Sequence, residues 1–135
     1  MGADGLTNLH SSCGPQETIT RLEAAVRDRG MTVFAHIDHA AGAAEDGMAL
    51  RPTEVVLFGN AKGGTPLMQA AQTIGIDLPL KALVWQDEAG ATWLSYNDPV
   101  WLAERHGVGP QGQAAVDRMT AVLHEVAAAA TTGAP

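Results

Sequence analysis

An aspartate and a histidine stand side by side at positions 38 and 39, where a predicted strand gives way to a predicted helix. This pair could act in general acid–base chemistry, or it could ligate a metal together with His36. Asp38 is equally typical of a helix N-cap, whose carboxylate accepts backbone N–H groups two or three residues further on. His36 and His39 fall on opposite faces of a continuing strand, so we expect no metal site built on both.

A glycine-containing loop, residues 59–65, follows the next predicted strand. A loop that runs from a strand into a helix exposes backbone N–H groups, and the helix dipole favours an anion there. Asn60 and Lys62 lie in this loop, and Lys62 adds a positive charge. The order of residues differs from the phosphate loop of nucleotide hydrolases, in which the lysine follows the glycines. The alternative is a tight turn that leads into an ordinary helix start at Thr65 and Pro66.

Two further residues carry chemistry that the sequence leaves open. Tyr96 closes a predicted hairpin and could present its hydroxyl to a ligand. Cys13 is the only cysteine, and it precedes a predicted helix whose N-terminus could activate a thiolate. His10 is nearby in sequence, and the other interpretation is a flexible, incidental thiol. The chain has no Gly-x-Ser-x-Gly nucleophile elbow.

Composition limits the classes of function that these residues can serve. The net charge is −7 and the eight basic residues are scattered, which argues against nucleic acid and against an anionic membrane surface. No apolar run approaches the roughly 20 residues of a membrane span. A single cysteine excludes an intramolecular disulfide and a zinc site built on several thiolates, and it fits a reducing cytoplasm.

Hydrophobic periodicity predicts the elements that must position these residues. Strands are expected near residues 6–11, 31–38, 54–58, 80–86 and 92–96, and helices over 15–29, 39–47, 66–74, 99–106 and 111–129. This order predicts an α+β fold in two layers, with helices packed on a mixed sheet. We expect a single domain over residues 1–135, with an ordered core of about 6–130 and a frayed tail at 131–135.

The connection between the second and third predicted strands decides whether the polar residues meet. Residues 39–53 are just long enough for a right-handed crossover between parallel neighbours. Both strands would then deliver their C-terminal residues to the same edge of the sheet, where ligands of α/β sheets commonly bind. We therefore expect a shallow concavity that contains Asp38, His39, Asn60 and Lys62, with the Thr65–Pro66 helix start at its wall.

Several motifs between residues 37 and 98 occur together. They are Ile37-Asp38-His39, Leu50-Arg51-Pro52-Thr53-Glu54, Phe58-Gly59-Asn60, Gly64-Thr65-Pro66-Leu67-Met68, Asp77-Leu78-Pro79-Leu80-Lys81 and Ser95-Tyr96-Asn97-Asp98. With them the chain resembles, over about 100 of its 135 residues, the bacterial and archaeal family called domain of unknown function 302. The resemblance implies a two-layer α/β domain that usually associates as a dimer, and it implies no reaction. One departure is Ala61, which stands where a proline is common and implies a less rigid loop at Lys62.

Three classes of function remain open at this point. The leading hypothesis is a cytoplasmic, homodimeric binding or accessory protein for a small polar or anionic ligand, held by some of Asp38, His39, Asn60, Lys62, Thr65 and Tyr96. Three tryptophans in a chain with few other aromatic residues also favour a dimer. The second is an enzyme in which His39 is the general base and Lys62 or loop amides stabilise an anion. The third is an interaction module in which these residues serve only as caps and turns. We expect no cofactor, no nucleic acid and no membrane partner.

Overall fold

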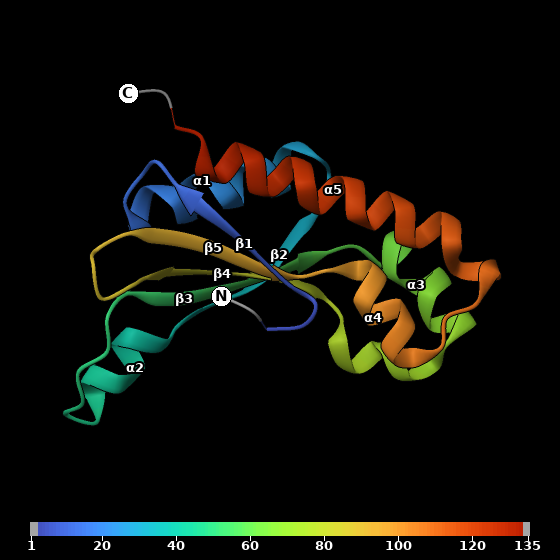
Figure 1. Cartoon of the computed structure of the whole chain (residues 1–135), viewed down its shortest axis with the longest axis horizontal. Helices are drawn as coiled ribbons and strands as arrows, with labels where there is room; N and C mark the ends of the chain where they lie inside the picture. Colours follow the sequence, from blue (N-terminus) through green and yellow to red (C-terminus); the bar gives the residue numbers. More distant parts are fainter. Residues whose placement is uncertain (1–2, 134–135) are drawn as a thin grey trace.

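The computed structural model describes residues 3–133, which form a five-stranded sheet with helices mainly on one of its faces (Figure 1). The strands are β1 (Leu6–Ser11), β2 (Thr32–Asp38), β3 (Thr53–Gly59), β4 (Leu80–Gln86) and β5 (Thr92–Asn97). Their order is β1-β5-β4-β3-β2, and every neighbouring pair is antiparallel. The predicted α+β class is confirmed, but the sheet is antiparallel throughout and not mixed.

The helices divide into three groups around this sheet. They are α1 (Pro15–Asp28), α2 (His39–Glu45), α3 (Ala61–Ala70), α4 (Pro99–His106) and α5 (Gln113–Thr131), with short 3-10 helices η1 (Gln72–Asp77) and η2 (Pro110–Gly112). Helices α1 and α5 lie side by side over one face, α3 and α4 gather at one end, and α2 lies at the other end (Figure 1). Within residues 3–133, no helix is long and apolar enough to cross a membrane.

The core lies between the sheet and the pair α1 and α5. Ile19 and Leu22 on α1 and Leu123 on α5 are buried, as the helical spacing of apolar residues predicts. They pack against the buried strand residues Val56 and Leu94. Each large aliphatic side chain contributes about 1.5–3 kcal/mol when it is buried in this way. This layer therefore fixes which face of every strand points inward.

Side-chain caps set the starts of three helices. Asp38 Oδ1 accepts the backbone N–H of Ala41 at 2.8 Å, and Asp98 caps α4 in the same way. Asn60 Oδ1 accepts the N–H of Gly63 at 2.7 Å, so α3 begins at Ala61. The predicted start at Thr65 and Pro66 is wrong, because the Asn60 cap stabilises an earlier start. Both residues lie inside α3, where the proline forfeits one intrahelical hydrogen bond.

The predicted crossover between β2 and β3 is also wrong. The two strands pair antiparallel, with Asp38 opposite Glu54 and Thr32 opposite Gly59. A crossover helix must bury an apolar face against the sheet, and α2 buries none of its residues. Its sequence, residues 39–45, offers only alanines as apolar side chains, which have too little area to hold it across a sheet. The connection therefore returns the chain beside the strand it has just left.

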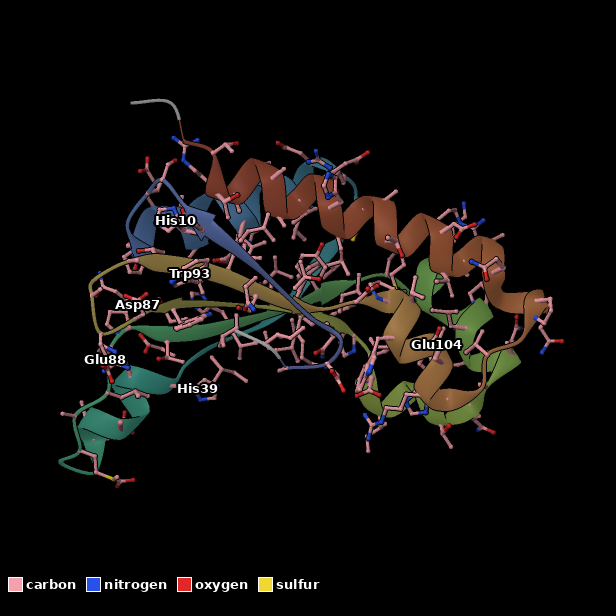
Figure 2. The ribbon with its side chains drawn as sticks, in the orientation of Figure 1. His10, His39, Asp87, Glu88, Trp93 and Glu104 are labelled. Atoms are coloured by element: carbon pink, nitrogen blue, oxygen red, sulfur yellow. The ribbon has the colours of Figure 1, made fainter. Side chains whose placement is uncertain are left out.

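The second face of the sheet, which we call the open face, has no helix across its middle among residues 3–133 (Figure 1). The strand residues that alternate with the buried ones point to it, namely Ile37, Val55, Leu57, Leu83, Trp85 and Trp93. Trp85 and Trp93 stack at a centroid distance of 6.2 Å. The indole N–H of Trp93 donates to Asp87 Oδ2 at 2.9 Å, and this hydrogen bond lowers the pKa of the Asp87 carboxyl. Figure 2 shows His10, Trp93 and Asp87 near the end of the sheet where β4 turns into β5.

The end of α5 is tied to the end of β1. Ser12 donates its backbone N–H to the carbonyl of Thr131 at 2.9 Å, and its hydroxyl accepts the N–H of Gly133 at 3.0 Å. Thr131 is buried in the last turn of α5. Residues 131–133 therefore have hydrogen-bond partners at the end of β1, and the frayed tail expected over residues 131–135 stays a prediction. Residues 134 and 135 lie outside the described residues.

Gly5 stands at a close contact between the start of the chain and α4. Its φ is +73°, and a Cβ atom built there would lie 2.3 Å from Cδ2 of Trp101. Its carbonyl accepts the N–H of Asp98 at 2.7 Å, which anchors the segment to the start of α4. Gly90, in the hairpin between β4 and β5, has a similar φ of +85° but nothing within 4 Å of such a Cβ. A substitution at Gly90 would therefore meet backbone strain alone, whereas a substitution at Gly5 would meet both backbone strain and steric overlap with Trp101.

We expect Gly5→Ala to destabilise the fold more than Gly90→Ala. The Gly90 variant should lose about 1–2 kcal/mol, the cost of a left-handed backbone in an L-residue. The Gly5 variant should lose about 2–5 kcal/mol, because the ring of Trp101 must also move. Urea denaturation followed by circular dichroism measures both. Equal losses would contradict the contact between Gly5 and Trp101.

Candidate functional site

The residues proposed from sequence fall into two groups at opposite ends of β3. Asp38 pairs with Glu54 at the start of β3, whereas Asn60 follows Gly59 at its end. Five residues of strand, at about 3.3 Å each, put about 17 Å between the two groups. The predicted concavity shared by Asp38, His39, Asn60 and Lys62 therefore does not form, because it required a parallel pair.

The histidines at the first end have different surroundings. His36 lies between two carboxylates, with Nε2 2.8 Å from Glu54 Oε1 and Nδ1 3.4 Å from Glu23 Oε1. It thus links β2 to α1 and β3 on the covered side of the sheet. His39 is exposed at the start of α2 and borders a depression of about 480 Å³ on the open face. This depression is lined by Leu6, His39, Val55, Lys81, Leu83, Trp85, Ser95, Tyr96 and Asn97.

Tyr96 is the one sequence candidate that borders this depression together with His39. Its ring packs against the hydrophobic core, and burial raises the pKa of its phenol above the ordinary value. A hydrogen bond with Thr7 acts in the opposite direction and is the smaller cause. A half-buried phenol that packs on the core in this way stabilises the sheet, and the role of Tyr96 toward a ligand stays a prediction.

The larger depression lies at the second end and contains Asn60 and Lys62. We call it the α3 cavity; its volume is about 710 Å³. It is lined by Arg29, Met31, Phe34, Phe58, Gly59, Asn60, Ala61, Lys62, Gly63, Gly64, Met68, Gly75, Leu78, Pro79, Leu80, Ala115, Arg118, Met119 and Val122. Ligand pockets in proteins commonly measure about 300–1,000 Å³. Thr65, which was also proposed from sequence, is exposed and does not line it.

Three cationic side chains line the α3 cavity, and each comes from a different part of the fold. Arg29 follows α1, Lys62 lies in the first turn of α3, and Arg118 lies on α5. They are three of only eight basic residues in a chain of net charge −7. Arg29 pairs with Glu125 at 3.3 Å, whereas Lys62 and Arg118 have no ion pair within the described part of the chain.

The N-terminus of α3 adds backbone donors to this positive region. The first N–H groups of a helix have no partner within the helix. Gly63 and Gly64 direct theirs to Asn60, at 2.7 Å to the side chain and 3.2 Å to the carbonyl. The N–H groups of Ala61 and Lys62 have no hydrogen bond among residues 3–133. Together with the cations, they make the α3 cavity suited to an anionic group.

Neither arginine of this cavity carried a signal in the sequence. Arg118 is exposed and lies outside the buried face of α5, next to the half-buried Val122. A basic residue on the exposed side of an amphipathic helix is ordinary, so it does not mark a cavity. Arg29 follows the last turn of α1, and it borders the cavity only because the chain then folds back as β2.

A hydrogen-bonded cluster joins η1 to α4 outside both depressions. His106 Nδ1 lies 2.9 Å from Thr73 Oγ1, and His106 Nε2 lies 2.5 Å from Asp77 Oδ2. The order hydroxyl, imidazole and carboxylate resembles a nucleophile with its base and orienting acid. Arg105 also binds both oxygens of Asp77, and Thr73 lines neither depression. We therefore assign the cluster to holding α4 against η1.

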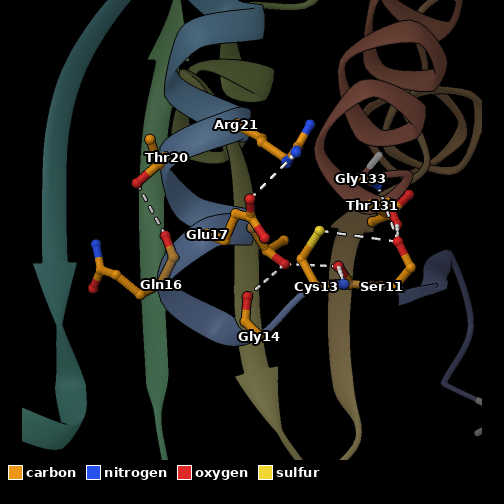
Figure 3. Close-up of polar contacts among 11 residues, drawn as sticks. Ser11, Cys13, Gly14, Gln16, Glu17, Thr20, Arg21, Thr131 and Gly133 are labelled. Carbon is orange, nitrogen blue, oxygen red and sulfur yellow. Dashed lines mark hydrogen bonds and ion pairs between the residues drawn. The ribbon is translucent and has the colours of Figure 1, made fainter. Parts of the chain in front are cut away.

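Cys13 lies in a polar network at the start of α1 (Figure 3). Its backbone N–H donates to Ser11 Oγ at 3.1 Å, and Ser11 Oγ lies 2.7 Å from Thr18 Oγ1. The only described hydrogen bond of its sulfur is to Ser12 Oγ at 3.9 Å. His10 instead contacts Trp93 on the open face, so it supplies no base to the thiol.

Comparison with known proteins identifies the class to which this two-layer α+β fold belongs. The model of the family described as Domain of unknown function DUF302 matches residues 7–126. The chain therefore belongs to the DUF302 family. A crystal structure of an uncharacterized conserved protein DUF302 from Bacillus stearothermophilus has the same fold, with a TM-score of 0.84 at 21% identity. The similarity covers 96% of this chain and 100% of that one.

Similar sequence also occurs within longer proteins. The chain is 48% identical over 115 residues to Fluoride-specific ion channel FluC 1 of Brucella suis, which is 85% of this chain and 45% of that protein. Fluoride-specific ion channel FluC 2 of Brucella melitensis is also 48% identical, with 43% of its length covered. The chain thus spans less than half the length of these curated relatives.

Proposed function

We propose that this chain is a cytoplasmic, homodimeric binding protein whose ligand is a small organic anion held in the α3 cavity. The single observation that carries the proposal is the clustering of Arg29, Lys62 and Arg118 around an apolar cavity in a chain of net charge −7. Scattered surface cations need no such explanation, but cations from three elements that border one cavity favour an anion there.

Physical estimates place the affinity in a modest range. The α3 dipole contributes about 0.3–1 kcal/mol to an anion at its N-terminus. Exposed cations such as Lys62 contribute comparable, salt-screened amounts. The apolar wall lowers the local dielectric and strengthens each of these interactions. A bare anion should therefore bind weakly, while a larger organic anion gains from both the charges and the wall.

The enzyme hypothesis in its original form fails on geometry. It required His39 as a base and Lys62 as the stabilising group at one reaction centre. The two residues lie at opposite ends of β3, about 17 Å apart along the strand, so one chain cannot bring both to one substrate. A general base must lie within hydrogen-bond reach of the proton it takes.

Removing the cavity cations should weaken the binding of an organic anion. We expect Lys62→Ala and Arg118→Ala each to lower the affinity for hexanoate about two- to fivefold, corresponding to about 0.3–1 kcal/mol. Isothermal titration calorimetry at low salt measures the affinity, and the melting temperature should stay nearly unchanged because both residues are exposed. Arg27→Ala, which removes an exposed cation on α1 outside the cavity, is the matched control.

The binding proposal fails under two results. One is the absence of saturable hexanoate binding at millimolar concentration. The other is equal affinity in the wild type, both cavity variants and the Arg27→Ala control. Hexanol, which has the same tail without the charge, should bind equally to the wild type and the variants.

The dimer in this proposal rests on the open face. Five strands at about 4.8 Å and seven residues at about 3.3 Å give a flat area of roughly 550 Å². Side-chain relief raises its accessible area toward the roughly 800 Å² that each partner buries in a standard interface. Trp85, Trp93 and Leu83 supply the aromatic and aliphatic surface that such interfaces prefer. Two copies of the chain related by a twofold axis would each bury the open face against the other.

We expect the wild type to be a dimer at micromolar concentration by light scattering, with and without reductant. Leu83→Glu, which places a charge on the open face, should give a folded monomer because a buried unpaired carboxylate disfavours association. Ile76→Glu is the matched control, since Ile76 is 75% exposed and lies on η1, away from the open face. A monomeric wild type refutes the dimer, and dissociation by reductant refutes an association without a disulfide.

A second candidate function is an accessory role beside a fluoride channel. The observation that favours it is the 48% identity to proteins named fluoride-specific ion channels, in which the similar region is less than half of the chain. A domain similar to part of proteins with this name can serve the same class of channel.

This candidate predicts that deleting the gene from its host lowers the sodium fluoride concentration that arrests growth. The reason is that a channel without its accessory domain works less well, so fluoride accumulates. Growth in matched sodium chloride is the control for salt, and the intact gene should restore tolerance. Unchanged fluoride tolerance in the deletion strain would remove this candidate and leave the binding proposal untouched.

A further inference from the structure

We infer that the ligand of the α3 cavity is amphipathic, with one anionic head and an unbranched apolar tail of the kind found in alkyl carboxylates. The inference rests on the proposed function and specifies the ligand class. The head would lie at Lys62, Arg118 and the start of α3, and the tail along the wall formed by β4, α5 and the segment before β4.

The wall of the cavity supports the tail. Its side chains beyond the cations and Asn60 are apolar, and they include Leu78, Leu80, Met119 and Val122. A sugar or a nucleotide would bring several hydroxyl or amide groups into this region. Each such group loses its hydrogen bonds to water and finds no partner on the wall, which is costly. An alkyl tail has no such groups and gains from leaving water.

Methionines give this wall an adaptable shape. Met31, Met68 and Met119 all line the cavity, and the chain has only five methionines. Methionine has three rotatable bonds and a polarizable sulfur, so it fills irregular space and adjusts to its contacts. Such a wall fits flexible chains of different length better than it fits one rigid ring system. The ligand class should therefore be defined by head charge and tail length.

Phe34 is a large apolar residue whose position is otherwise unexplained. It lies at an irregularity in β2, where the register with β3 shifts between Val33 and Ala35. Bulges of this kind turn a side chain in a new direction and are common beside functional sites. Phe34 is 54% exposed and lines the α3 cavity, 3.9 Å from a Cβ built on Gly59. A bound tail would cover this ring and remove its apolar surface from water.

The test is a calorimetric series of butanoate, hexanoate, octanoate and decanoate, each kept below its micelle concentration. Affinity should rise by about two- to fourfold for each added methylene until the cavity is filled. Lys62→Ala should lower the affinity for every carboxylate of the series by a similar factor. The gain in affinity for each added methylene should stay unchanged. Decyltrimethylammonium, with a similar tail and a cationic head, should bind at least tenfold more weakly than decanoate.

Variants locate the tail. Val122→Trp narrows the cavity and should shorten the chain length at which affinity levels off, whereas Ala121→Trp, on an exposed position of the same helix, should not. Leu83→Glu should leave the series unchanged, because the open face lies on the other side of the sheet. If Val122→Trp does not fold, the gain in affinity for each methylene, compared between the wild type and Leu83→Glu, still decides where the tail binds.

The outcomes separate the two levels of the argument. Binding of butanoate that does not strengthen with chain length would overturn the amphipathic ligand and leave the proposed anion site intact. No binding by any carboxylate would overturn both. Decyltrimethylammonium binding as tightly as decanoate would overturn the anionic head. Loss of the increments in Leu83→Glu would move the tail to the open face and overturn the placement in the α3 cavity.

Discussion

The antiparallel pairing of β2 with β3 determines where the polar residues of this protein lie. It places Asp38 beside Glu54 and carries the chain to Asn60 at the opposite end of the sheet. The same pairing brings Phe34 and the loop after β3 to one corner, where α5 closes the remaining side. A parallel pair would have gathered acid and base at one edge. The observed pair instead separates Asp38 from the cations, which removes a carboxylate that would repel an anion.

Local structure was predictable from this sequence because short-range physics decides it. The strands at 80–86 and 92–97, and the capping roles of Asp38 and Asp98, follow from periodicity and from side chains that bond neighbouring N–H groups. Two competing signals misled the prediction at α3, where the Asn60 cap prevails over Thr65 and Pro66. The relative direction of β2 and β3 was not predictable, because the connection between them is long enough for either a parallel crossover or an antiparallel pair. Only the lack of buried residues in α2 decides between the two.

The candidate site was predictable in part for the same reason. Asn60 and Lys62 follow a buried strand and open a helix, and the sequence alone shows this. Arg29 and Arg118 reach the site from elements far apart in the chain, through packing that no short motif encodes. Membership of the DUF302 family supports the fold but identifies no ligand or reaction. The proposal that an anion binds in the α3 cavity therefore depends on the geometry and charge of the cavity. The names of the curated relatives identify no functional residue of this chain.

The bonds between Ser12 and the end of α5 have a mechanical consequence. They hold residues 131–133 at the far end of β1, while the described chain begins near the other end of that strand. A pull between the two ends of the described chain would therefore run along β1 and strain its six-residue register with β5 in shear. Hydrogen bonds in shear resist together, whereas bonds peeled from one end fail one at a time. A domain tethered on both sides would in this way keep its sheet closed under tension.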